Sequence, residues 1–104
     1  ALLREYKEIA YQWGIWKTEE SPEELLVLLP DPYEQQLTLF SSPHRKLEWL
    51  SVRVLLYQLL GEEKTIEYAP SGKPHLADSS YFISISHTRG YVAVILSPVS
   101  EVGI

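Results

Sequence analysis

The 104-residue chain lacks cysteine and methionine altogether. Without cysteine, disulfides, zinc–thiolate centres and thiol catalysis are excluded. Methionine is missing even at position 1 and the last residues are apolar and uncapped, so we expect the chain to be part of a longer parent protein. No apolar run approaches the length that crosses a bilayer, and no secretory signal pattern is present. A cytoplasmic protein is the default expectation.

Apolar residues make up 45% of the chain and aromatic residues 12%, which predicts one folded unit with a real core. Charge is uneven: residues 1–34 carry three basic against eight acidic side chains, whereas residues 35–104 carry six of each and all three histidines. The overall charge of −5 argues against a nucleic-acid surface, which normally needs a basic stripe. Local cations after residue 35 could still hold a small anion, so the search for a site belongs there.

The N-terminal third predicts a strand followed by short helices. Residues 5–16 alternate with period two, which predicts one long strand with Trp13 and Ile15 on the face toward the core and Gly14 on the other. Ser21, Pro22 and Glu24 have the form of a capping box, which predicts a short helix through residue 29. A second short helix is expected over residues 33–40.

The remainder predicts one long helix and a series of strands. Ser42 and Pro43 open the helix, which runs to residue 60 and ends at Gly61. It is apolar on most sides and leaves a narrow polar strip of Glu48, Ser51 and Gln58. Strands are expected at residues 65–69, 75–76, 82–86 and 91–96 and from residue 102. This order predicts an α+β domain whose long central helix precedes an antiparallel β-meander.

The first candidate for chemistry is Arg45, in the opening turn of the long helix. Helical spacing aims it along the apolar stripe that contains Trp49, so we expect its guanidinium to point toward the protein. A helix N-terminus beside an arginine can receive a phosphate. An arginine that covers the core edge or pairs with a glutamate explains the position equally simply, and from position alone it is the commoner case. Arg53, deeper in the helix, is a weaker candidate.

Two turns supply the other candidates. Residues 84–88, Ser-Ile-Ser-His-Thr, place His87 and hydroxyl groups at the mouth of a hairpin, where they could bind phosphate or a sugar, or simply stabilise the turn. A serine–histidine hydrolase is rejected because neighbouring strand residues point to opposite faces. Gly72, Lys73 and Pro74 form either a ligand-approaching turn or an ordinary β-turn. The three histidines lack the spacing of a zinc site.

These signals occur in the order seen in one family. The chain resembles the larger, surfactin-type 4′-phosphopantetheinyl transferases, which have a helix-opening arginine, a Gly-Lys-Pro turn, an Asn-Ile-Ser-His-Ser segment and a strand reading Gly-Ile-Asp-Ile-Glu. Arg45, the turn at residues 72–74, the segment at residues 84–88 and the end at residues 102–104 match that order. The match covers residues 43–104. Ser84 and Thr88 replace the usual asparagine and serine, and Gln35 and Gln36 lie where lysines are often found.

The resemblance implies a role for each matching residue. Arg45 and His87 would hold the 3′-phosphate of coenzyme A, and Ser86 would contact the nucleotide. Lys73, flanked by Gly72 and Pro74, would lie against the adenine and its phosphates. The family's magnesium-binding acidic residues would follow directly after Ile104, so no metal ligand or catalytic residue is expected within the chain itself.

The resulting hypothesis is that residues 1–104 form the N-terminal half-domain of a transferase that moves 4′-phosphopantetheine from coenzyme A to a serine of an apo acyl or peptidyl carrier protein. This half alone should be inactive. Without the second half-domain, an apolar face should be uncovered, through which the chain can self-associate. The competing hypothesis is a non-enzymatic α+β interaction or ligand-binding domain. Neither the carrier protein nor the pathway, whether lipid or secondary-metabolite biosynthesis, follows from the sequence.

Overall fold

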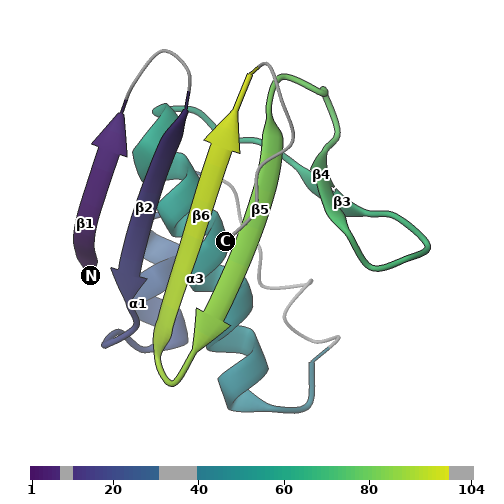
Figure 1. Cartoon of the computed structure of the whole chain (residues 1–104). Helices are drawn as coiled ribbons and strands as arrows, with labels where there is room; N and C mark the ends of the chain where they lie inside the picture. The colour runs from purple at the N-terminus through teal and green to yellow at the C-terminus, as the bar shows by residue number, and fades with distance from the viewer. Residues whose placement is uncertain (8–10, 31–39, 99–104) are drawn as a thin grey trace.

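A computed structural model describes residues 1–7, 11–30 and 40–98 of the chain. The elements along the chain are β1 (Leu2–Lys7), β2 (Gln12–Lys17), α1 (Pro22–Val27), α3 (Pro43–Leu60), β3 (Ile66–Tyr68), β4 (Pro74–Leu76), β5 (Phe82–Thr88) and β6 (Tyr91–Ser97). Four strands form an antiparallel sheet in the order β1-β2-β6-β5, and β3 pairs with β4 in a second, two-stranded sheet (Figure 1). The predicted α+β class is confirmed.

The prediction of one long N-terminal strand is wrong. β1 and β2 are separate strands that pair antiparallel, with Tyr6 opposite Trp13 and Lys7 opposite Gln12. Both arms of such a hairpin alternate with the same period as a continuous strand. Periodicity alone therefore could not reveal that the chain reverses.

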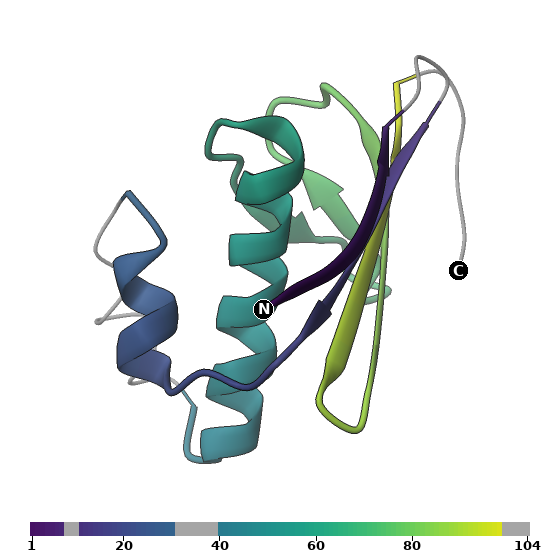
Figure 2. The ribbon, with the colours of Figure 1, turned by 90° about the vertical axis from the view of Figure 1, so that its left-hand side faces the viewer.

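The predicted core face of β2 is also wrong. Gly14 and Trp16 face α3 and are buried, while Trp13 and Ile15 lie on the opposite face and are half-buried. A Cβ at Gly14 would lie 2.8 Å from Cδ1 of Leu55, so only glycine lets the strand approach the helix this closely. Figure 2 shows both helices on one side of the sheet. The close approach at Gly14 and the burial of the Trp16 side chain together place this face of β2 inside.

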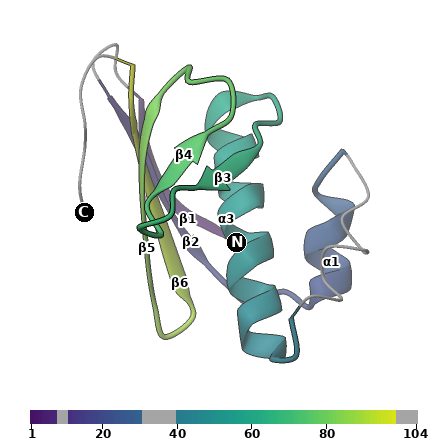
Figure 3. The same ribbon diagram turned by 90° about the vertical axis from the view of Figure 1, so that its right-hand side faces the viewer.

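Helix α3 has the boundaries predicted for it. The Ser42 side chain accepts a hydrogen bond from the backbone N–H of Arg45, and Gly61 ends the helix with a φ of 71°. The core forms between α3 and the sheet, with α1 on the other side of α3 (Figure 3). Its buried apolar residues are Trp16, Leu25, Leu29, Leu50, Val52, Val54, Leu55, Leu56, Leu59, Ile66, Leu76, Ile83, Val92, Val94 and Leu96.

One member of the predicted polar strip on α3 is instead inside the protein. Ser51 is fully buried, and its hydroxyl is 2.7 Å from the hydroxyl of Thr18. The hydrogen bond satisfies the buried hydroxyl groups and ties α3 to the segment after β2. Helical spacing correctly placed Ser51 on the same side of α3 as its polar neighbours. It could not show that the segment containing Thr18 covers this position.

The capping box of α1 is confirmed, because Ser21 and Glu24 exchange side-chain to backbone hydrogen bonds. The second short helix, predicted over residues 33–40, falls almost entirely outside the described residues, and the strand predicted from residue 102 lies wholly outside them.

The prediction that the strands after α3 form a single antiparallel meander is wrong. β3 and β4 form their own sheet beside β5, and β6 lies between β5 and β2 because the N-terminal hairpin adds to its free edge (Figure 3).

An ion-pair cluster ties the end of α3 to the segment after β4. Lys64 Nζ lies 2.8 Å from Glu62 and 2.6 Å from Asp78. Hydrogen bonds from Lys64 and then from the hydroxyl and backbone N–H of Ser80 hold the pKa of Asp78 well below its usual range. Asp78 therefore stabilises the fold at neutral pH, and this contribution is lost as the pH falls through the ordinary carboxyl range.

We accordingly expect Asp78→Asn to lower the urea unfolding midpoint at pH 7. The difference from the unsubstituted chain should shrink as the pH is lowered from about 6 toward about 2, because the unfolded chain then takes up a proton on Asp78 while the folded chain still holds the charge. Glu19→Gln, at an exposed acidic position, is the control and should leave the midpoint unchanged. A constant difference between the Asp78→Asn and unsubstituted proteins across this range would contradict the assignment.

Candidate functional site

A cleft of about 350 Å³ lies between the first half of α3, the β3–β4 hairpin and β5. On α3, residues 45, 49 and 52 share one face because they are separated by three or four positions. On β5, residues 85 and 87 share the face toward α3 because strand side chains alternate. The lining residues are Phe40, Arg45, Glu48, Trp49, Val52, Arg53, Tyr68, Gly72, Pro74, Ile85 and His87.

Arg45 lines this cleft from the first turn of α3. The expectation that its guanidinium points away from water is wrong, since the side chain is exposed. The expectation that it follows the Trp49 stripe agrees with the structure, because Arg45, Trp49 and Val52 line the same cleft. An exposed arginine at the mouth of a cleft can meet an anion without losing its own hydration entirely.

Arg53 forms part of the wall at a deeper level. Its guanidinium carbon lies 3.8 Å from the centroid of the Trp49 ring, and Nη1 donates to the Trp49 carbonyl at 3.3 Å. Arg53 is only 9% exposed, and stacking on the indole offsets the free-energy cost of burying its charge. Phe40 packs against the same indole, with ring centroids 6.1 Å apart. Arg53 therefore brings positive charge to the cleft wall and fixes the orientation of Trp49.

His87 reaches the cleft from the end of β5, and its partner is a residue that the sequence analysis placed on a solvent-facing strip. Nδ1 of His87 lies 2.6 Å from Oε2 of Glu48, whose other oxygen lies 2.8 Å from Nε2 of His44. The spacing of His44 and Glu48, four residues apart on a helix, was a signal for the second contact. The contact between His87 and Glu48 joins two distant parts of the chain, and nothing in the sequence predicted it.

Ser86 is not brought into the cleft. Ile85 and His87 occupy the face of β5 toward α3, so Ser84 and Ser86 lie on the opposite face of the sheet, where Ser86 is opposite Ala93 of β6. The prediction that Ser86 and His87 form one corner of a binding site is wrong for this reason. Thr88, at the end of β5, lines a separate hollow of about 290 Å³ together with His44 and His87.

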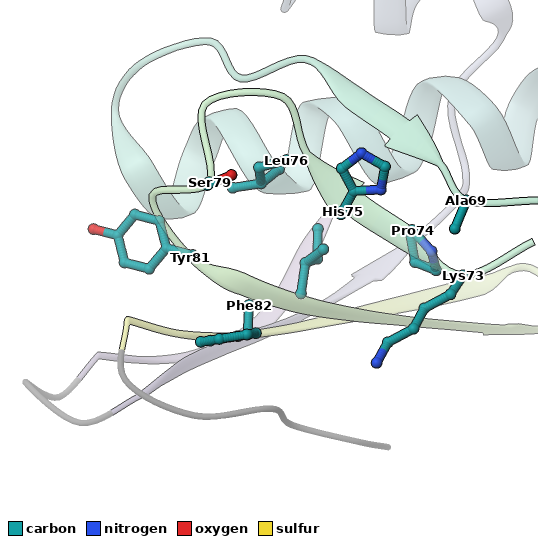
Figure 4. A pocket seen from close by; sticks show the side chains of 9 residues that line it. Ala69, Lys73, Pro74, His75, Leu76, Ser79, Tyr81 and Phe82 are labelled. Carbon is teal, nitrogen blue, oxygen red and sulfur yellow. The ribbon is translucent and has the colours of Figure 1, made fainter.

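The Gly72-Lys73-Pro74 turn is divided between two hollows. Gly72 has a φ of 90° and donates to the Ala69 carbonyl, and the Ala69 N–H donates to the Lys73 carbonyl, which closes a tight turn. Gly72 and Pro74 line the cleft with Arg45, whereas Lys73 lines an adjacent hollow of about 450 Å³. Figure 4 shows Lys73 beside Pro74 at one end of this hollow, with Tyr81 at the other end.

The structure therefore brings Arg45, Gly72, Pro74 and His87 together, places Lys73 in the neighbouring hollow, and separates Ser86 from them. Within residues 1–7, 11–30 and 40–98, no group of three or more metal-ligating side chains could hold an ion. No helix of this described part is long and apolar enough to span a membrane. Comparison with family models and with curated proteins finds no match to the chain.

Proposed function

We propose that the chain is the coenzyme A-binding half-domain of a 4′-phosphopantetheinyl transferase. The observation that carries the proposal is the cleft itself, where three segments distant in sequence contribute Arg45, the Gly72–Pro74 turn and His87. Positions that resemble the family's coenzyme A residues only by order along the chain thus share one cavity.

The chemistry of the cleft suits a nucleotide that carries a terminal phosphate. Arg45 and Arg53 supply positive charge and His87 supplies a titratable ring, while Trp49 and Tyr68 offer aromatic surface for a base. We assign the 3′-phosphate to Arg45 and His87. We place the adenine against the glycine and proline of the turn, and we assign the diphosphate to the adjoining hollow that Lys73 lines. Ser86 has no role in this assignment.

The transferred group would leave coenzyme A by attack of a carrier serine hydroxyl on the diphosphate phosphorus that bears the pantetheine arm. A new serine oxygen–phosphorus bond forms, the bridging phosphorus–oxygen bond breaks, and adenosine 3′,5′-bisphosphate leaves as the serine proton is released. In the family a magnesium ion neutralises the diphosphate during this step. The described residues do not fit such an ion, so we assign this half-domain to nucleotide binding alone.

A second candidate function rests on another surface. Tyr6 stacks on both Tyr11 and Trp13, with ring centroids 5.4 and 6.0 Å away, on the face of the sheet opposite the helices. Tyr6 and Tyr11 are 39% and 40% exposed, so this aromatic face is accessible. Such a face suits binding to another protein surface, either a second half-domain, a second copy of the chain, or the partner of a non-enzymatic interaction domain.

The test of the proposed function is a transfer assay with the parent protein, coenzyme A, magnesium and an apo carrier protein. We expect the carrier to gain one phosphopantetheine group on its serine, detected by intact-mass spectrometry, and residues 1–104 alone to give no transfer. We also expect the parent gene to continue with an Asp-x-Glu pattern directly after Ile104. A parent protein that lacks this pattern and modifies no apo carrier would refute the assignment.

A further inference from the structure

Glu48 connects two histidines at the edge of the cleft. Its carboxylate oxygens lie 2.8 Å from Nε2 of His44 and 2.6 Å from Nδ1 of His87. The glutamate side chain is 20% exposed, whereas the two imidazole side chains are 66% and 58% exposed. The carboxylate is therefore the enclosed member of the cluster, and it fixes how His87 can present itself to a ligand.

The contact with Glu48 determines which nitrogen of His87 carries a proton. A carboxylate only accepts hydrogen bonds, so Nδ1 must be the donor across the 2.6 Å contact. A neutral imidazole has a single N–H, so Nε2 then holds a lone pair and repels an anion. His87 can offer Nε2–H to a phosphate while Nδ1 stays on Glu48 only if the ring takes up a second proton.

We infer that Glu48 is a positioning residue that commits Nδ1 of His87, so that the cleft binds a phosphate anion together with a proton. This inference rests on the proposed function, since it assumes that the cleft receives a phosphate. When the anion arrives, a solvent proton attaches to Nε2 and the imidazolium then lies between two negative groups, the carboxylate and the phosphate. The proton returns to solvent when the ligand leaves.

Few charged or titratable side chains surround His87 in the two hollows that it borders. The charged or titratable residues that line the two hollows bordered by His87 are His44, Arg45, Glu48 and Arg53 of α3, Tyr68 of β3, Arg89 of the β5–β6 turn and Tyr91 of β6. Within this set, an imidazole is the side chain that can carry either one or two N–H groups. Glu48 contacts both histidines, so a proton that accompanies the ligand belongs to this cluster.

A second histidine–glutamate pair provides an internal control. His75 contacts Glu67 through Nε2 at 3.3 Å, on the exposed surface of the β3–β4 hairpin, and neither residue lines the cleft. This pair has the same chemistry as Glu48 and His87, but His75 borders the adjoining hollow and not the cleft that receives the 3′-phosphate. A ligand-linked proton on His87 and not on His75 would separate the site from general surface titration.

The experiment is histidine side-chain ¹H–¹⁵N NMR on the 104-residue chain, with signals assigned by His44→Gln and His75→Gln. Without ligand at pH 8, we expect His87 to be protonated at Nδ1 only. With millimolar adenosine 3′-monophosphate, which has no phosphate to place in the hollow beside His75, both ring nitrogens of His87 should be protonated, while His75 stays unchanged. Because one proton binds with each anion, the affinity should fall by up to about tenfold per pH unit between pH 7 and pH 9.

Replacing Glu48 tests whether its carboxylate commits Nδ1. The substitution must leave no hydrogen-bonding group beside the ring, because a glutamine could either accept from Nδ1 or donate to it. Glu48→Ala frees the ring to place its single proton on Nε2, so the ligand should bind neutral His87 and the affinity should change less than about threefold per pH unit. Glu67→Ala, the matched control, should leave the binding curve unchanged.

The experiment distinguishes a failure of the role of Glu48 from a failure of the proposed function. Binding to neutral His87 in the unsubstituted chain, or an unaltered pH dependence in a folded Glu48→Ala protein, would overturn the role of Glu48 while leaving the nucleotide site intact. Absence of any ligand-induced shift at residues lining the cleft, even at tens of millimolar nucleotide, would overturn the proposed function itself. Dispersed backbone amide spectra show that each variant is folded.

Discussion

Substituting Arg45 by glutamine and His87 by alanine together should, under the proposed function, lower kcat/KM for phosphopantetheine transfer by the parent protein about 10²- to 10⁴-fold. The proposal gives each side chain a charge-assisted contact to the 3′-phosphate, and such contacts contribute about 1.5–3 kcal/mol each. Either single substitution should therefore cost about 10- to 150-fold. Most of the effect should appear as a higher KM for coenzyme A, because the 3′-phosphate lies away from the bond that breaks.

Lys46→Gln is the matched control for this experiment. Lys46 is in the same first turn of α3 and loses the same charge, but it does not line the cleft. With this substitution, kcat/KM of the parent protein should stay within about twofold of the unsubstituted value, because Lys46 lies outside the cleft. Both cleft residues are exposed, so their replacement should leave the thermal midpoint nearly unchanged. Full activity in the folded double variant would remove the physical basis of the site.

Gly14→Val should destabilise the fold strongly. A Cβ at this position would lie 2.8 Å from Cδ1 of Leu55 and 3.2 Å from Cδ2 of Leu59, and both leucines are buried in the core. Forcing extra carbons between strand and helix should cost about 3 kcal/mol. For a chain of this size the melting temperature should fall by more than about 10 °C, measured by circular dichroism.

A double-mutant cycle tests the cause of that loss. Leu55→Ala alone should destabilise by about 2–5 kcal/mol because it leaves a cavity. In the double variant Gly14→Val, Leu55→Ala the new side chain can occupy part of that space, so the combined loss should be smaller than the sum by about 1 kcal/mol or more. Strict additivity would show that β2 and α3 do not meet as described.

Elements with strong local signals were predictable from the sequence. The boundaries of α3 follow from Ser42, Pro43 and Gly61, and the start of α1 follows from its capping box. The strands after α3 are also where alternation and turn residues put them. These signals act within a few residues, through backbone conformation and short-range hydrogen bonds, so they survive without knowledge of the partner elements.

Pairing and sidedness were not predictable in the same way. The alternating pattern of residues 11–17 is apolar on both faces, so hydrophobicity could not decide between them. The N-terminal hairpin adds to β6, a strand about eighty residues away, and this pairing has no local signal. The close approach of Gly14 to Leu55 becomes visible only once both elements are placed.

The candidate site shows the same division. Arg45, His87 and the glycine and proline of the turn were identified from residue type, position and a family resemblance, and the structure places them in one cleft. Alternation within residues 84–88 already implied that Ser86 and His87 point to opposite faces, yet the resemblance grouped them. Glu48 could be found only in three dimensions, because its contact with His87 joins α3 to β5.

By itself, the sequence determined the boundaries of α3, the start of α1, the strands between α3 and residue 98, the absence of thiol chemistry and the residue types available to bind an anion. Only the tertiary structure decided which strands pair, which face of β2 is buried, and which polar side chains share a cleft. The physical reason is the range of the interactions. Caps, turns and periodicity are set by neighbours along the chain, whereas packing distances and ion pairs such as that of Glu48 with His87 depend on segments that meet only after folding.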